Sequence, residues 1–254
     1  MKTMSFNVLC AGEPKKRYWT NRKELVLSLI RSYMPDTFGL QEAHDQWMRY
    51  LAMALPEYAY IGIGRDNGKR LGEFSPVFYL KDRFTLLEEG HFWLSETPGM
   101  VSFGWDAACR RICSYALLQD KESGKKLAHF NTHLDHVGEN AQLNGARLVA
   151  SQAKKYRDIP TILTGDFNDF PYSEPYMAVT EAGFTDARKA APDTTSWHTF
   201  HNFDRPLDGT IRREIIDYIF VRNIPEVRVF DVLTDTPDGE YPSDHYPVTA
   251  EFDL

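Results

Sequence analysis

Carboxylate, amide and imidazole side chains recur where predicted strands end, and these residue types activate water and bind cations. The acidic members include Glu42, Asp166 and Asp244. If these three share one pocket, each pair about 4 Å apart would repel by about 4 kcal/mol at an effective dielectric constant near 20. A hard cation neutralises such a group, and oxygen ligands without thiolates select Mg²⁺, or else Mn²⁺, over zinc. The sequence therefore predicts a magnesium site, with protonation of some carboxylates as the alternative.

Two histidines have candidate carboxylate partners. A neutral imidazole that is hydrogen-bonded to a carboxylate is oriented and becomes more basic, so it can donate a proton to a phosphate oxygen or stabilise a charge in the transition state. Asp217 with His245 is the first such pair, and Glu73 is the candidate carboxylate for His133. We therefore expect general acid–base chemistry beside the cation.

The elements that position these residues are mostly short strands. Alternating apolar residues predict strands at residues 5–10 and 38–41, and helical spacing predicts a helix that begins with Asn21 as its cap and ends before Pro35. Many further short strands follow, with few helices. This pattern favours an α+β sandwich in which two sheets pack face to face, with catalytic groups mounted on loops at one edge.

The composition limits the class of protein. The 254 residues are 43% hydrophobic and 26% charged, which is typical of a globular protein, and we expect a single domain over residues 1–254. No apolar run is long enough for a membrane span, and the odd count of three cysteines suggests a reducing compartment, so we predict a cytoplasmic protein. A net charge of −7 argues against a broad cationic face for long nucleic acid, but it does not exclude a phosphate substrate.

Short motifs in a fixed order carry a family resemblance. They are SFN at 5–7, QE at 41–42, THLD at 132–135, GDFN at 165–168, IDYIF at 216–220 and SDH at 243–245. Together they resemble the endonuclease/exonuclease/phosphatase superfamily. The resemblance implies a four-layer sandwich, in which two mixed β-sheets are flanked by helices, with a metal-dependent phosphoesterase site at one end.

The resemblance also implies roles for the metal and water sites. Glu42 would be the principal metal ligand, with Asn7 and Asp244 near the same ion. Asp166 and Asn168 would orient or deprotonate the attacking water and contact the phosphate.

Further roles follow from the same resemblance. His245, held by Asp217, would stabilise the phosphorane. His133 occupies the position where deoxyribonuclease I and the sphingomyelinases have histidine and apurinic endonucleases have tyrosine, which argues against apurinic-site repair. Glu73 fits the supporting carboxylate of His133, and Arg111 resembles a family arginine that touches the scissile phosphate, although Arg110 beside it leaves the register open.

Other polar residues near these motifs have two interpretations. His201 lies in an aromatic segment at residues 197–203, and it would either contact the substrate or belong to a packed aromatic loop. Asp135 and His136 lie two and three residues after His133, and both are open between a functional and a structural role. His201 is therefore a candidate substrate contact.

Two segments narrow the resemblance. Residues 92–98 and 199–203 are similar to a bacterial branch related to carbon catabolite repressor-type deadenylases. We therefore expect a Mg²⁺-dependent phosphodiesterase or nuclease that uses direct attack of water on a phosphodiester, with single-stranded nucleic acid as a candidate substrate. The alternatives are a hydrolase of a small phosphorylated metabolite or lipid head group, and, less favoured, a catalytically silent phosphate-binding module. No obligate protein partner is indicated.

Overall fold

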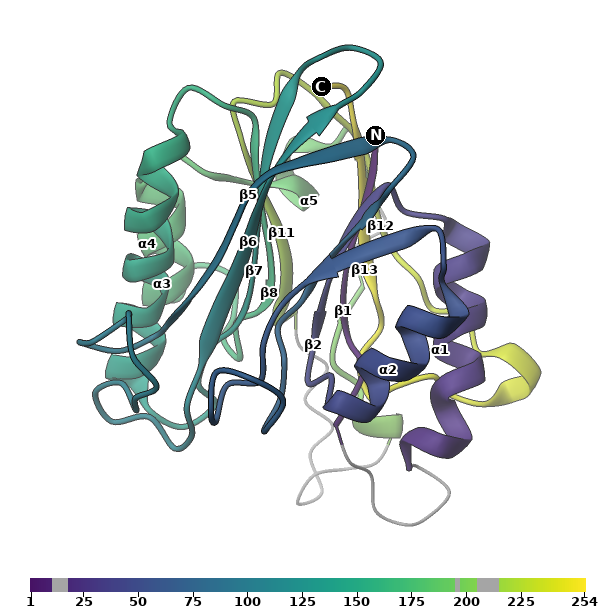
Figure 1. Ribbon diagram of the computed structural model, residues 1–254, viewed down its shortest axis with the longest axis horizontal. Coiled ribbons are helices and arrows are strands. Elements are labelled where there is room, and N and C mark those ends of the chain that lie inside the picture. The colour runs from purple at the N-terminus through teal and green to yellow at the C-terminus, as the bar shows by residue number, and fades with distance from the viewer. Residues whose placement is uncertain (11–17, 195–196, 205–214) are drawn as a thin grey trace.

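Two β-sheets pack face to face, and helices cover both outer faces, as Figure 1 shows. This is a computed structural model, and it describes residues 1–10, 18–194, 197–204 and 215–254. The predicted α+β sandwich of two mixed sheets is confirmed. Within those residues, every helix is too short or too polar to pass through a lipid bilayer.

One sheet has seven strands in the order β10-β12-β13-β1-β2-β4-β3. At its centre β1 runs parallel to β2 and antiparallel to β13, so both ends of the chain contribute to the middle of the sheet. Its strands are β1 (Lys2–Asn7), β2 (Thr37–Gln41), β3 (Tyr58–Ile61), β4 (Val77–Leu80), β10 (Asp193–Thr194), β12 (Val227–Val232) and β13 (Val248–Phe252).

The other sheet has six strands in the order β5-β6-β7-β8-β11-β9. Its β7 and β8 run parallel, and β11 pairs antiparallel with β8 so that Asp217 lies opposite Asp166. Its strands are β5 (Phe84–Trp93), β6 (Ile112–Asp120), β7 (Lys126–His133), β8 (Thr161–Asp166), β9 (Thr185–Asp186) and β11 (Asp217–Arg222).

Helices bury the outer face of each sheet through apolar side chains. On the seven-stranded sheet, α1 (Trp19–Tyr33) and α2 (Asp45–Ala54) pack against Phe6 and Phe38. On the six-stranded sheet, α3 (Glu139–Ala153) and α4 (Glu174–Glu181) pack on Phe130 and its neighbours, and the short α5 (Ala187–Ala190) packs beside β11 and β12. Short 3-10 turns complete the chain at Lys154–Tyr156, Asn202–Asp204 and Pro237–Gly239.

The space between the sheets changes from apolar to polar along its length. Strand side chains alternate between faces, and β7 turns Leu127, His129, Asn131 and His133 inward, in that order toward its carboxyl end. The first of these joins an apolar cluster, the middle two make hydrogen bonds across the sandwich, and the last lines a cavity. The carboxyl end of the parallel strands is therefore where polar chemistry collects.

Two predicted boundaries were wrong. The first helix begins at Trp19 rather than after a cap at Asn21, and the Trp19 ring packs 5.7 Å from Trp47, so tertiary packing outweighs the local capping signal. The first strand ends at Asn7 rather than at residue 10, because the backbone turns out of the sheet at Leu9, whose φ is +55°.

Candidate active site

A cavity of about 250 Å³ opens at the end of the sandwich where β2, β7 and β8 finish. Both sheets contribute to it, and Asn7 and Asp217 lie directly behind its wall, in contact with residues that line it. The lining residues are Glu42, Arg65, Glu73, Cys109, Arg111, His133, His136, Asp166, Asn168, Phe200, Asp244 and His245. Most of the predicted site residues are therefore brought to one place.

Glu42 is fixed at the end of β2 by hydrogen bonds to both carboxylate oxygens. The Cys10 N–H donates to Oε2 at 2.9 Å, and the Asn7 Nδ2 donates to Oε1 at 3.0 Å. Burial alone would raise the pKa of Glu42, but these hydrogen bonds lower it, so the carboxylate is ionised. The residue itself has φ of +60°, a strained conformation that aims the side chain at the cavity.

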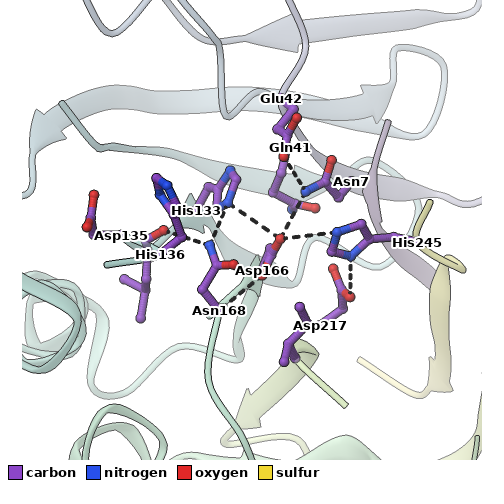
Figure 2. A network of polar contacts seen from close by, with 12 residues as sticks. Asn7, Gln41, Glu42, His133, Asp135, His136, Asp166, Asn168, Asp217 and His245 are labelled. Atoms are coloured by element: carbon purple, nitrogen blue, oxygen red, sulfur yellow. Dashed lines mark hydrogen bonds and ion pairs between the residues drawn. The ribbon is translucent and has the colours of Figure 1, made fainter. Parts of the chain in front are cut away.

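One amide joins carboxylates from the two sheets. The same Nδ2 of Asn7 also donates to Asp166 Oδ2 at 2.9 Å, while its Oδ1 accepts from the Leu9 N–H at 3.0 Å. The nitrogen of this amide, rather than its oxygen, therefore faces Glu42 and Asp166 (Figure 2). This orientation differs from the expected metal ligand, which would present the oxygen.

His245 and Asp217 form the predicted pair. His245 Nδ1 lies 2.8 Å from Asp217 Oδ2, and His245 Nε2 lies 3.8 Å from Asp166 Oδ2. Burial opposes the charge on His245, but Asp217 outweighs it and raises the pKa of the imidazole well above its usual value. Burial, together with the nearby Asp217 carboxylate, raises the pKa of Asp166 to about 7. The site thus holds a carboxylate poised near neutrality beside a protonated imidazole.

His133 and Asn168 are directed at each other from β7 and from the turn after β8. The Asn168 Nδ2 lies 2.9 Å from His133 Nε2 and also donates to the Leu134 carbonyl at 3.1 Å. That second bond fixes the amide, so His133 Nε2 is the acceptor and the imidazole proton is on Nδ1. Burial and the nearby Arg111 lower the pKa of His133 well below its usual value, which keeps the ring neutral.

Glu73 lines the cavity but does not support His133 as predicted. Its two oxygens accept from Arg65 at 2.6 and 2.9 Å. A bidentate guanidinium is a stronger partner for a half-buried carboxylate than a neutral imidazole, which explains the difference. Arg65 was missed from the sequence, where the only signal was the glycine-rich turn at residues 62–68 that presents it.

Of the two neighbouring arginines, Arg111 lines the cavity and Arg110 does not. Arg111 is 5% exposed and lies 3.6 Å from Asp135 Oδ2, and its Nη2 donates to His136 Nδ1 at 3.1 Å. Arg110 turns away, 4.4 Å over the Phe103 ring. Asp135 accepts hydrogen bonds from the Ala108, Val137 and Gly138 N–H groups, so it holds the two loops that carry this corner.

The structure does not place His201 in the cavity, which corrects its prediction as a substrate contact. Its ring is 1% exposed and packs 4.2 Å from Tyr246 and 4.6 Å from Tyr241. The aromatic residue that does line the cavity is Phe200, 4.9 Å from the His245 ring. The backbone N–H of His201 donates to the Asp244 carbonyl at 3.0 Å, so the segment positions Asp244 instead.

The donor set suits a hard cation. Glu42, Asp166 and Asp244 supply only carboxylate oxygens to the cavity, and burial, with Glu42 nearby, raises the pKa of Asp244. Acidic groups whose ionisation is disfavoured by their surroundings gain stability from a divalent ion. The residues present therefore fit a divalent cation bound by oxygen.

Known proteins share both the sequence pattern and this architecture. Residues 4–245 match the Endonuclease/Exonuclease/phosphatase family. Nocturnin from Homo sapiens is 26% identical over 99% of this chain, which spans 65% of that protein's length. A solved endonuclease/exonuclease/phosphatase from Bacteroides vulgatus is 36% identical, with a TM-score of 0.93 over 100% of this chain and 98% of that one.

A second solved structure is similar over the full length of both chains. It is a mannosyl-6-phosphatase from Bacteroides thetaiotaomicron, 35% identical, with a TM-score of 0.92. The predicted resemblance to the superfamily and to deadenylase relatives is thereby confirmed. The chain belongs to the Endonuclease/Exonuclease/phosphatase family.

Proposed function

We propose that this protein is a Mg²⁺-dependent hydrolase of small phosphate esters, with Mn²⁺ as an alternative ion, and that it acts by direct attack of water. The observation that carries the proposal is the convergence of Glu42, Asp166 and Asp244 with the His245–Asp217 pair in one cavity. Glu42 and Asp244 are the proposed ligands, and Asn7 holds Glu42 and Asp166 in place as a donor. When bound, the ion supplies positive charge against the phosphate oxygens.

Asp166 is the proposed base. With its pKa raised to about 7 by burial and Asp217, it can take a proton from the attacking water at neutral pH. The water oxygen forms a bond to phosphorus, the ester P–O bond breaks, and the leaving oxygen takes a proton from solvent. Protonated His245 donates a hydrogen bond to a phosphate oxygen, where negative charge develops, and Asn168 keeps the neutral ring of His133 in place at the cavity wall.

The proposed substrate is a phosphorylated sugar or a metabolite of similar size. A cavity of about 250 Å³ matches one phosphate and one ring, and a net charge of −7 disfavours long polyanions. The solved mannosyl-6-phosphatase, similar over both full chains, supports this class. The motifs alone favoured a phosphodiesterase or nuclease over a hydrolase of small phosphorylated metabolites, and the present proposal reverses that order.

A nuclease is the second candidate. The alignment of 93% of this chain with a protein named as a 3′-5′ exoribonuclease subunit, at 23% identity, favours it. Under this candidate the substrate would be a short single strand, because the charge of the chain gives little general affinity for nucleic acid. A cytoplasmic location and action without an obligate protein partner remain part of the proposal.

The test is a substrate profile of the purified protein after chelator treatment. Mannose 6-phosphate, p-nitrophenyl phosphate, bis(p-nitrophenyl) phosphate and short RNA are supplied with and without Mg²⁺ or Mn²⁺. We expect metal-dependent release of phosphate from the monoesters, a loss of at least about 10³-fold in Glu42→Ala, and none in Glu122→Ala, which alters an exposed carboxylate in a distant turn. Preferential cleavage of RNA, with a steep salt dependence, would favour the nuclease instead.

A further inference from the structure

One corner of the cavity is built from residues that the proposed water and cation chemistry does not use. His136 lines the cavity with an exposed side chain, and its Nδ1 lies 3.1 Å from Arg111 Nη2. A guanidinium can only donate, so Nδ1 is the acceptor, and the neutral ring carries its proton on Nε2. The corner therefore presents an imidazole N–H donor that is anchored to a fixed positive charge.

The position of this corner separates it from the other donors of the site. Figure 2 shows His136 on the opposite side of Asn168 and Asp166 from His245. Arg111 is 5% exposed and is held from behind by Asp135, which is itself 1% exposed and also binds the Val137 and Gly138 N–H groups. Arg111 is therefore held in place, and this corner faces the cavity from the side opposite His245.

We propose that His136 and Arg111 bind a terminal phosphate oxygen and so select phosphate monoesters over diesters, an inference that rests on the proposed hydrolase function. A monoester carries three terminal oxygens and a charge of about −1.5 to −2 at pH 7, whereas a diester has two such oxygens and a single charge. Under the proposed function, the cation and His245 would bind two of these oxygens. Arg111 and His136 donate to the third terminal oxygen of a monoester. In a diester the oxygen at this position would carry the second ester group. His136 is the residue that determines the specificity for monoesters under this proposal.

The experiment compares kcat/KM for p-nitrophenyl phosphate and methyl p-nitrophenyl phosphate at pH 8. Loss of one hydrogen bond to a charged oxygen corresponds to about tenfold or more. We therefore expect His136→Ala to lower kcat/KM for the monoester about tenfold and for the diester less than twofold. His136→Gln, which keeps a donor, restores most of the monoester activity. Val137→Ala, an exposed change at the next residue, leaves both values unchanged.

Two outcomes overturn the inference. Equal losses for both esters in His136→Ala would show a general role in the site, and no loss for either would show that the residue does not contact the phosphate. Calorimetric titration with inorganic phosphate tests the corner without turnover: a dissociation constant unchanged by His136→Ala refutes it. If the wild-type protein binds phosphate through His136 but hydrolyses neither ester, the proposed hydrolase function is wrong, whereas phosphate binding by His136 and Arg111 is supported.

Discussion

The outer and inner interfaces of the sandwich are built on different chemistry. Where α3 and α4 cover the six-stranded sheet, the buried contacts are apolar and aromatic, and the same holds beneath α1 and α2 on the other sheet. Between the sheets, toward the cavity, the buried side chains include Thr37, His129, Asn131 and Thr164. These four polar side chains belong to a hydrogen-bond network that reaches from one sheet to the other, whereas the contacts beneath the helices are mainly apolar.

Asn131 is the centre of the inner interface. Its Nδ2 donates to the Leu40 carbonyl at 2.7 Å and to the Pro76 carbonyl at 2.9 Å, both on the opposite sheet. Its Oδ1 accepts from Gln41 Nε2 at 2.7 Å and from the Thr164 hydroxyl at 2.9 Å. No Cβ fits at Gly39, because it would lie 2.2 Å from this Oδ1. The amide is fully satisfied, and it joins strands from both sheets.

The difference follows from what each interface must position. Apolar burial is non-directional, so it stabilises a helix on a sheet without fixing the placement closely. The candidate site takes Asn7 and Glu42 from one sheet and His133 and Asp166 from the other, so its geometry depends on how the sheets sit relative to each other. A polar network specifies that placement, and its members Gln41, Asn131 and Thr164 lie within two residues of Glu42, His133 and Asp166, respectively.

The largest expected effect comes from the carboxylate at the cavity end of this interface. Asp166→Asn should lower kcat at least about 10³-fold, because the amide cannot accept the proton of the attacking water. Burial and Asp217 raise the pKa of Asp166 to about 7, above the value in the unfolded chain. The contribution of protonated Asp166 to the free energy of unfolding is therefore lost as the pH rises toward and through 7. At pH 8 without metal, the free energy of unfolding of Asp166→Asn should exceed that of the wild-type protein by at least about 1 kcal/mol. Activity assays and urea unfolding measure the two quantities.

Asn131→Leu tests whether the inner interface positions the site. The change keeps the volume but leaves carbonyl and amide groups without partners, so we expect a loss of about 3 kcal/mol in the free energy of unfolding. Because the sheets then shift relative to each other, kcat should fall about tenfold to a hundredfold in the folded protein, with a smaller change in KM. An unchanged kcat at that cost in stability would mean that the network contributes to folding alone.

Val149→Ala is the matched change at an outer interface. Val149 is 1% exposed on α3 and packs in the apolar cluster over the six-stranded sheet. Removing two methyl groups should cost about 2 kcal/mol in the free energy of unfolding. We expect kcat to stay within about twofold of the wild-type value below the unfolding transition. If kcat instead fell as far as in Asn131→Leu, the contrast between the two kinds of interface would be lost.

The same contrast explains what the sequence could predict. Residues at strand ends, such as Glu42 and Asp166, stand out because a polar residue interrupts an apolar pattern, and the motifs around them point to one family. His129 and Asn131 lie within a strand whose neighbours are apolar, where a polar residue has no local signal of a partner. Their partners Thr37 and Leu40 are about 90 residues away. The prediction that Glu73 supports His133 was wrong for a related reason. Its partner is Arg65, and only the turn between these two residues brings them together.

The smallest effect we predict isolates one buried imidazole of the inner interface. His129 is fully buried, with its ring nitrogens 2.8 Å from the Thr37 hydroxyl and 2.9 Å from the Thr164 hydroxyl. Burial lowers its pKa to about 3 from an ordinary value of 6.5. Below pH 6.5 the imidazole of His129 is protonated in the unfolded chain but stays neutral in the folded protein. The contribution of neutral His129 to the free energy of unfolding is therefore fully present above pH 6.5 and is lost as the pH falls toward 3.

His129→Gln removes that titration while leaving the other ionisable groups of the site in place. Its absolute stability at pH 8 is not the measure, since the new side chain alters packing as well. Between pH 6 and pH 5 the wild-type protein should lose about 1 kcal/mol more of its unfolding free energy than the variant, as measured by urea denaturation at each pH. Parallel curves for the two proteins would show that water or a second proton reaches His129. In that case the space between the sheets would be less dry than its hydrogen bonds imply, and the sheets would be held together by apolar contacts, as the helices are.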